Sequence, residues 1–279
     1  MCRGSMTNSV QTGKIPPILL VGCGRMGSAM LSGWREQGLS PSCAVDPYPG
    51  AASFAGPDMV VVADAASVPA DFVPAAVVLA VKPQNAADTL PAYARFVGKT
   101  VFLSIMAGRT IAGIDALLGG NAAVVRAMPN TPAAVRQGVT VAVASPGVDA
   151  AGRALCDRLL QAIGTVAWAD REELLDPVTA VSGSGPAYVF LLAELMERAA
   201  IEQGIPPDLA RLLARQTVSG SGALLAASAD DAADLRKAVT SPGGTTAAAL
   251  NVLMAEANWP KAMSEAIAAA TARSRELAG

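Results

Sequence analysis

The sequence predicts an α/β domain with a doubly wound sheet of the Rossmann type, followed by an all-α domain. Three observations support this. A glycine-rich turn joins a short apolar strand to a helix near the N-terminus, further β-like apolar runs recur to about residue 143, and the strand signal disappears after residue 170. We expect a disordered extension over residues 1–14, a dinucleotide-binding domain over 15–170 and a helical substrate-binding and oligomerisation domain over 171–279.

The first element is a buried strand at residues 18–21, followed by a glycine turn and a helix from Ser28 to Trp34. The turn has the pattern G-x-G-x-x-G in the strand-to-helix context that a dinucleotide-binding turn requires. Its first glycine makes the tight turn, its second lets a pyrophosphate approach the backbone, and its third lets helix and strand pack closely. The expected cofactor contacts are Gly22, Cys23, Gly24, Arg25, Met26 and Gly27.

The second strand, residues 43–45, ends at Asp46, which lies 19 positions after Gly27. A carboxylate there accepts hydrogen bonds from the hydroxyls of the adenine ribose and repels a 2′-phosphate. No Arg or Lys lies between Arg35 and Lys82 to neutralise such a phosphate. Asp46 therefore favours NADH over NADPH. The alternative is that Asp46 is a turn residue before Pro47.

A third strand is expected at 76–81, ending in Lys82 and Pro83, and further strands at 101–105, 122–126 and 139–143. Ligands bind at the carboxyl ends of strands in an open parallel sheet. Two strand-end loops carry small residues, one with Ala107 and Gly108 and the other with Asn130. Such loops could let a flat nicotinamide ring lie close to the backbone.

The second half predicts helices. Asp176 and Pro177 fit an N-cap and a first helical position, Pro186 is expected to break or kink that helix, and Gly204 to end it. Further helices are expected at 207–228, 231–239, 245–257 and 260–277. Residues 187–195 and 223–227 are apolar nearly all round, and a helix of that kind is buried on every side. In so small a domain this indicates packing against a second subunit.

The composition narrows the function. Hydrophobic residues make up 52% of the 279 and charged residues 16%, against about 25% charged in typical domains, which again favours a subunit interface. A net charge of −2 without a basic run argues against nucleic acid, and the longest apolar stretch, 75–81, is far below the ~20 residues that span a bilayer. Four cysteines without C-x-x-C spacing and no secretory signal fit a cytoplasmic protein. The chain has no histidine, so its chemistry rests on hydroxyls, amides, carboxylates or a cofactor, and we expect no metal.

Residues 241–246 form a hydroxyl- and glycine-rich turn between two helix-like segments. Pro242 ends the preceding helix, and the glycines after it allow a tight fold. The free N–H groups of the next helix then lie beside two threonine hydroxyls, which suits a small anion such as a carboxylate. The alternative is an ordinary N-capped helix start.

Five segments in order along residues 18–277 together resemble the Δ1-pyrroline-5-carboxylate reductase family. They are Val21 to Gly27, Ala80 to Pro83, Met128 to Pro132, Ser182 to Tyr188, and Leu235 to Leu253 with the 241–246 turn. The resemblance implies reduction of a cyclic imine to L-proline by NAD(P)H, the last step of proline biosynthesis. It also implies a Rossmann domain and a helical domain that interlocks in dimers, which often build larger rings.

By the same resemblance, the nucleotide contacts include Ser67, Val81, Lys82 and Ala107, to which we add Pro83, Gly108 and Asn130 from the strand-end loops. The implied proline contacts are Glu172, Gly243, Gly244, Thr245 and Thr246, with Ser241 shaping the loop. Two positions depart from the family pattern. Ala238 stands where some relatives have Asn, and Asp46 where many have Ser or an Arg-bearing phosphate site.

Reducing a C=N bond needs a hydride donor, a carboxylate anchor and a hydrogen-bond partner at nitrogen. The cofactor supplies the first and the amides after Gly243 the second. Thr246 is the catalytic candidate for the third. Its hydroxyl is too weakly acidic to donate a proton outright, so it orients the nitrogen of an iminium, or relays a proton from water.

Two other functions fit part of the pattern. A β-hydroxyacid dehydrogenase shares the two-domain plan but places a catalytic lysine on the long helix of its second domain, and no lysine lies between residues 100 and 236 here. A silent NAD-binding module explains the glycine turn but gives residues 241–246 no role.

Overall fold

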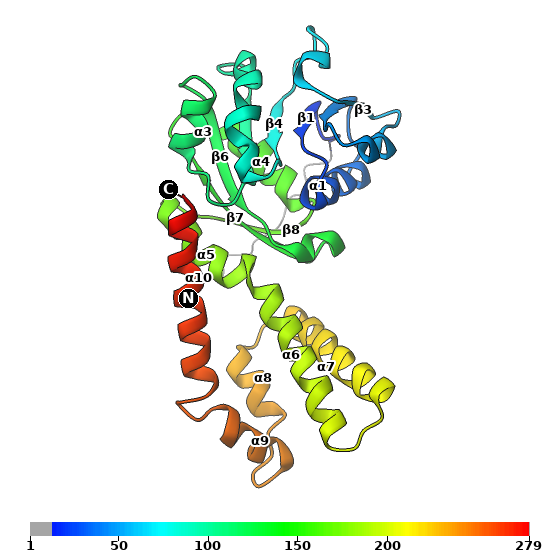
Figure 1. Cartoon of the computed structure of the whole chain (residues 1–279), viewed down its shortest axis with the longest axis vertical. Coiled ribbons are helices and arrows are strands. Elements are labelled where there is room, and N and C mark those ends of the chain that lie inside the picture. Colours follow the sequence, from blue (N-terminus) through cyan, green and yellow to red (C-terminus); the bar gives the residue numbers. More distant parts are fainter. Residues whose placement is uncertain (1–12, 279) are drawn as a thin grey trace, which may run out of the picture. The chain divides into compact units, whose positions relative to one another are not determined.

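The computed structural model describes residues 13–278 and divides into two compact units. Among the described residues, the first unit runs to Leu175 and also includes Ala278, and the second covers Asp176–Leu277. Figure 1 shows the sheet of the first unit and the helices of the second. The expected extension over residues 1–14 lies outside the described residues, apart from Gly13 and Lys14.

Within the described residues, the first unit is built on one eight-stranded sheet in the order β3-β2-β1-β4-β5-β6-β7-β8. Neighbouring strands are parallel except for β6 and β7, which are antiparallel. The strands are β1 Ile18–Val21, β2 Ser42–Val45, β3 Met59–Val62, β4 Ala76–Leu79, β5 Val101–Ser104, β6 Ala123–Met128, β7 Gly138–Ala144 and β8 Gly164–Trp168.

The helices of this unit cover the two faces of the sheet, and the alternation of side chains along each strand explains how. Leu20, Val78 and Leu103 share a core with the helices α1 and α4. The residues one position earlier, among them Leu19 and Val77, pack with α2 and α3. The helices are α1 Arg25–Glu36, α2 Ala86–Thr89, α3 Ile111–Leu117 and α4 Ala150–Gln161. Short 3-10 segments lie at Pro49–Phe54, Ala65–Ser67, Pro83–Asn85, Leu90–Phe96, Thr131–Val135 and Glu172–Leu174.

The predicted fold class is confirmed, with two omissions in the sheet. The expectation of six strands missed β3 and β8, which form the two edges of the sheet. Both lie half in solvent, since β3 is only partly buried and β8 alternates between half-buried and exposed positions. The strand expected at 76–81 ends at Leu79, and the backbone beyond it turns into the candidate cofactor site.

The second unit contains helices only, within its described residues. They are α5 Leu175–Val178, which begins one residue before the unit, α6 Gly185–Glu202, α7 Pro207–Ala227, α8 Ala232–Ala238, α9 Thr245–Leu253 and α10 Trp259–Ala278. Gly204 follows α6 with φ +86°, as expected for a residue that ends a helix. The helix expected at 245–257 ends four residues early, at Leu253.

The predicted start of the first long helix was wrong. A 3-10 turn at Glu172–Leu174 leads directly into α5, so Asp176 lies inside the helical segment rather than at its N-cap. The Asp176 carboxylate accepts a hydrogen bond of 2.7 Å from the buried hydroxyl of Ser274 on α10 instead. The break expected at Pro186 is a π-helical segment, Thr179–Gly183, after which Pro186 occupies the first turn of α6.

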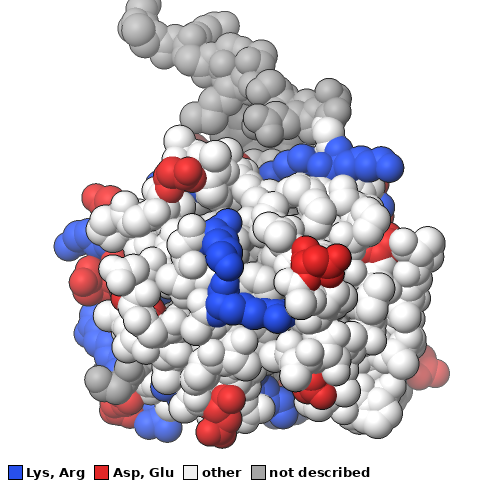
Figure 2. Space-filling view, turned by 90° about the horizontal axis from the view of Figure 1, so that it is seen from above, with Lys and Arg blue, Asp and Glu red and all other residues white. Residues whose placement is uncertain are grey.

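The helices of the second unit expose large apolar side chains. Phe190 on α6 is 68% exposed and Leu212 on α7 is 61% exposed, and no residue of α6 is buried within the chain. This matches the expectation that another subunit covers these helices. Figure 2 shows the molecule from above, where basic and acidic side chains lie scattered among uncharged surface.

Candidate active site

The glycine turn after β1 has the close contacts that the sequence pattern requires. Gly22 has φ +99°, and a Cβ there would lie 2.8 Å from the carbonyl oxygen of Ala80. A Cβ on Gly27 would collide with the carbonyl oxygen of Gly22. Gly24 differs, because it is the N-cap of α1, no side chain caps the helix, and the space above it is open. The first amides of α1 are therefore accessible to an anionic group.

Asp46 fixes the end of β2 to this turn. Its Oδ2 accepts a hydrogen bond of 2.6 Å from the amide of Cys23, and its Oδ1 accepts one of 2.9 Å from the amide of Tyr48. The second bond is the turn role that was the alternative for Asp46, and the first draws the carboxylate into the glycine turn. Asp46 therefore has the turn role, while its contact with the hydroxyls of the ribose stays a prediction.

A cavity of about 450 Å³ lies beside the turn, at the carboxyl ends of β1, β2, β3 and β4. It brings together five of the predicted cofactor residues, namely Gly22, Gly24, Asp46, Val81 and Lys82. Asp64, Asp88 and Tyr93 also line it, so three carboxylates face the single cation of Lys82. The lining is thus acidic, which suits ribose hydroxyls better than a further phosphate.

Sequence reasoning missed Asp64 and Tyr93. Asp64 follows β3, a strand that was not predicted, and its carboxylate caps the next turn by accepting 2.8 Å from the amide of Ser67. This hydrogen bond is the main reason that the pKa of Asp64 lies below its ordinary value. Burial raises the pKa of Tyr93 to about 12, so it remains a neutral phenol at the wall of the cavity.

Cys23 is buried inside the glycine turn. Burial, and secondarily the charge of Asp46, raise its pKa to about 11, so it stays protonated at neutral pH and is a poor nucleophile. Among the described residues, no group of three His, Cys, Asp or Glu could hold a metal ion.

The remaining nucleotide candidates do not line this cavity. Ala107 is exposed, and Gly108 has φ +70° in the loop between β5 and α3. Pro83 opens a 3-10 turn, and its carbonyl accepts 2.9 Å from Nε of Arg109. Asn130 is only 9% exposed, and its Oδ1 accepts 2.9 Å from the amide of Val139. The side-chain amide oxygen of Asn130 thus holds its loop to β7.

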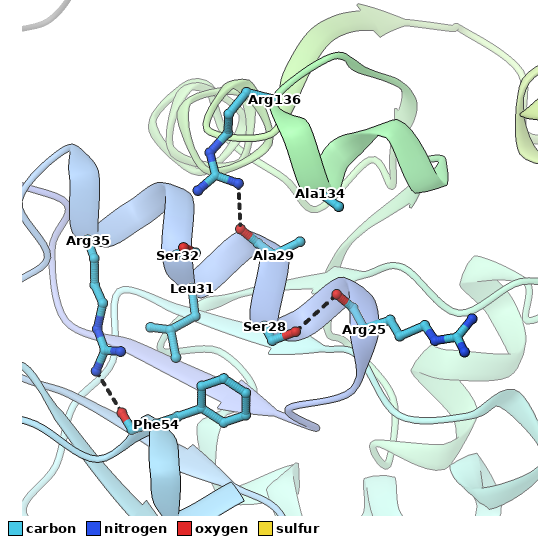
Figure 3. Close-up of a pocket in the computed structure, with 9 residues that line it drawn as sticks. All are labelled: Arg25, Ser28, Ala29, Leu31, Ser32, Arg35, Phe54, Ala134 and Arg136. Carbon is cyan, nitrogen blue, oxygen red and sulfur yellow. Dashed lines mark hydrogen bonds between the residues drawn. The ribbon is translucent and has the colours of Figure 1, made fainter. Parts of the chain in front are cut away.

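Arg25 lines a second cavity, of about 390 Å³, on the outer side of α1 (Figure 3). Arg35 and Arg136 also line it, but each is paired with a carboxylate, Asp58 at 3.0 Å and Glu36 at 2.7 Å respectively. In Figure 3 the guanidinium of Arg25 extends away from the other two. The three arginines therefore do not converge on one anion.

Glu172, which was expected to contact proline, lies in the first unit, where its carboxylate already accepts two hydrogen bonds. Its Oε1 accepts 2.8 Å from Nη1 of Arg126 and 2.8 Å from the amide of Ile111. The side chain of Arg126 is 7% exposed and that of Glu172 is 24% exposed. The sequence pattern pointed to neither partner.

The turn at residues 241–246 belongs to the second unit. Gly243 has φ +72°, and Gly244 is the N-cap of α9 with its amide donating 3.1 Å to the carbonyl of Ser241. A Cβ on Gly244 would collide with Oγ of Ser241. No side chain caps α9, and the hydroxyls of Thr245 and Thr246 have no hydrogen-bond partner among the described residues. The alternative of a side-chain N-cap is therefore not observed, and the first turn of α9 keeps free donors.

Comparison with known proteins decides the family. The model of pyrroline-5-carboxylate reductase dimerisation matches residues 172–277. Pyrroline-5-carboxylate reductase of Pseudomonas aeruginosa is 39% identical over 268 residues, which cover 94% of this chain and 97% of the relative. The chain belongs to the pyrroline-5-carboxylate reductase family.

Solved structures agree. The pyrroline-5-carboxylate reductase of Coxiella burnetii is 32% identical with a TM-score of 0.87, and the match covers 95% of this chain and 99% of that one. The Plasmodium falciparum pyrroline carboxylate reductase, solved with NADP bound, is 24% identical with a TM-score of 0.80 and shares the fold. Family membership confirms the resemblance of the motifs and the expected enzyme class.

The dimerisation region accounts for the exposed apolar helices. Residues 172–202 form the one helical segment in the described chain that is long and apolar enough, by length and composition alone, to cross a membrane, and only 6% of its apolar window is buried within the chain. The dimerisation model covers this whole segment. Self-association therefore explains its exposure, as the sequence predicted.

Proposed function

We propose that this chain reduces Δ1-pyrroline-5-carboxylate to L-proline with a nicotinamide cofactor, NADH being preferred. One observation carries the proposal beyond family membership. The 241–246 turn leaves two hydroxyls and the first amides of α9 without partners, in a chain whose other unit holds an open glycine turn. Imine reduction requires an anchor for the substrate carboxylate and a binding site for the cofactor, and these two features fit those requirements.

The start of α9 serves as the carboxylate anchor. The amides of Thr245 and Thr246 belong to the first helical turn, where N–H groups lack intrahelical acceptors and the helix dipole favours an anion. Gly243 and Gly244 make the approach possible, because side chains there would be strained or would meet Ser241. The substrate carboxylate lies against this backbone.

Thr246 orients the ring nitrogen. Thr246 is half-buried, and its hydroxyl has no hydrogen-bond partner among the described residues. The hydroxyl can therefore accept from an iminium N–H or donate to the nitrogen of the product. Holding the nitrogen fixes the position of the neighbouring carbon that receives hydride. The proton on nitrogen comes from the substrate iminium or from water through this hydroxyl.

The residues of the first unit fit a dinucleotide. The open space at Gly24 leaves the start of α1 free for the pyrophosphate, and Asp46 holds its carboxylate at the end of β2 for the ribose hydroxyls. The bound cofactor supplies the hydride. Asp46 with Asp64 disfavours a 2′-phosphate, because two carboxylates at the cavity would repel it.

The three described cysteines, Cys23, Cys43 and Cys156, are buried free thiols, which supports a cytoplasmic location as part of this proposal.

Cofactor oxidation with and without pyrroline-5-carboxylate tests the function. We expect oxidation of NADH only in the presence of the imine, with L-proline as product. A protein that binds NADH and never oxidises it would support the silent-module alternative and refute the proposal.

A further inference from the structure

An ion pair between Arg126, whose side chain is buried, and the half-buried Glu172 lies beside the loop of residues 105–110, which connects β5 to α3. Arg126 is on β6, and its register partner on β5 is Ser104, the last residue of that strand. Ser104 is fully buried, and its Oγ accepts 3.3 Å from the amide of Met106. Arg126 thus stands beside the point where the 105–110 loop begins.

Glu172 holds the other end of the same loop. Its Oε1 accepts 2.8 Å from the amide of Ile111, the first residue of α3, while it accepts 2.8 Å from Nη1 of Arg126. One carboxylate oxygen therefore joins β6 to the end of the loop. Between these two ends lie Ala107 and Gly108, the candidates for the nicotinamide half of the cofactor.

We infer that Arg126 is a positioning residue for hydride transfer, which acts through Glu172 to fix the 105–110 loop, the segment that would contact the nicotinamide ring. The inference rests on the proposed function. A buried guanidinium whose only partner among the described residues is Glu172 keeps that carboxylate in one place, because separating the two leaves an unpaired buried charge. A loop displaced by about 1 Å can slow a transfer step about 10²-fold.

The two carboxylate oxygens of Glu172 can have different roles. Its Oε1 is committed to Arg126 and Ile111, whereas no hydrogen bond from a described residue reaches its Oε2. The expected contact with the proline end can therefore use Oε2, while Oε1 holds the loop. Loss of Arg126 then affects both the loop and the orientation of that contact.

The test uses the oligomeric, full-length protein and the variants Arg126→Met, Arg126→Lys, Glu172→Gln and the double variant Arg126→Met/Glu172→Gln. The matched control is Arg35→Met, which breaks the Arg35–Asp58 pair in the same unit, away from the loop. For each variant we measure Tm, kcat, KM for both substrates, NADH affinity and hydrogen exchange of the peptide 105–111 with NADH alone.

We expect Arg126→Met to lower kcat about 30- to 100-fold, to weaken NADH affinity about threefold and to speed exchange in residues 105–111. Arg126→Lys keeps the charge and should recover part of kcat, and it serves as the test if Arg126→Met does not fold. The double variant should be no slower than the slower single variant, because both substitutions break one device. Arg35→Met should change Tm alone.

Arg126 variants that lose stability yet keep kcat and loop exchange within about threefold of wild type would overturn the inference, as would fully additive losses in the double variant. The exchange and NADH-binding measurements need no imine. If wild type fails to turn over pyrroline-5-carboxylate, the proposed function fails, and these two measurements still decide whether Arg126 positions the loop.

Discussion

Replacing Thr246 with alanine separates a catalytic role from a structural one. Thr246 is the second residue of α9, it is half-buried, and its hydroxyl has no hydrogen-bond partner among the described residues. A hydroxyl without a partner contributes little to folding. A hydroxyl whose only hydrogen-bond partner is the substrate nitrogen contributes to the reaction and not to folding.

The two magnitudes are far apart. Removing one preorganised hydrogen-bonding group costs about 10²-fold in kcat, or roughly 2.7 kcal/mol. Alanine is a better helix former than threonine by up to about 0.7 kcal/mol, and no cap is lost at this position, so stability should stay constant or rise. At roughly 2–4 °C per kcal/mol for a chain of this size, Tm should change by at most about +1 to +3 °C.

The assay is steady-state oxidation of NADH by pyrroline-5-carboxylate, with Tm and NADH affinity measured on the same samples. Thr245→Ala is the matched control, since Thr245 is the neighbouring exposed threonine and its proposed contact is through the backbone. Thr246→Ser keeps the hydroxyl and should recover most of kcat. A Thr246→Ala enzyme with normal kcat and a lowered Tm would refute the reasoning and make Thr246 a helix-start residue.

Three further outcomes follow. Measured at one salt concentration, kcat/KM should favour NADH or show no preference, and Asp46→Ser should raise kcat/KM for NADPH. A tenfold advantage for NADPH in the wild-type enzyme, about 1.4 kcal/mol, would show that Asp46 does not face the ribose. Light scattering should show an oligomer at sub-micromolar concentration, because the apolar faces of α6 and α7 are exposed in the single chain, and a folded, active monomer would contradict this. Burial raises the pKa of Cys23 from 9.0 to about 11 and that of Cys156 to about 12, so the folded state favours both thiols in their protonated form. Tm should therefore be constant with pH just below 9 and fall as pH rises from 9 to 12. A Tm unchanged to pH 11 would argue that both thiols are solvated.

Much of the first unit could be predicted because its central strands carry strong local signals. β1, β2, β4 and β5 are buried along their whole length, so each reads as an apolar run. Of the two edge strands, β8 begins with Gly164 and Thr165 and alternates between half-buried and exposed positions, which weakens that pattern. β3 is itself an apolar run, Met59–Val62, and the sequence interpretation overlooked it. The start of α5 was misplaced because Asp176 and Pro177 match an N-terminal pattern inside a helix that had already begun.

The candidate site also contains parts that the sequence predicted and parts that it did not. The glycine turn and the 241–246 turn depend on neighbouring residues and backbone conformation, so the sequence pattern found both. The bond between Arg126 and Glu172 joins residues 46 positions apart, and Tyr93 reaches the cofactor cavity from a 3-10 turn. Local patterns contain no information on such pairs, because sheet order and helix packing create them.

The most direct test of the central claim follows the hydride itself. The enzyme is given pyrroline-5-carboxylate and NADH deuterated at C4 of the nicotinamide ring, and the product is examined by mass spectrometry and NMR. We expect L-proline with one deuterium at the former imine carbon, C5, for one of the two C4 stereoisomers of the cofactor, and a proton from solvent on nitrogen. Absence of proline, or proline without deuterium from either stereoisomer, would contradict direct hydride transfer to a cyclic imine.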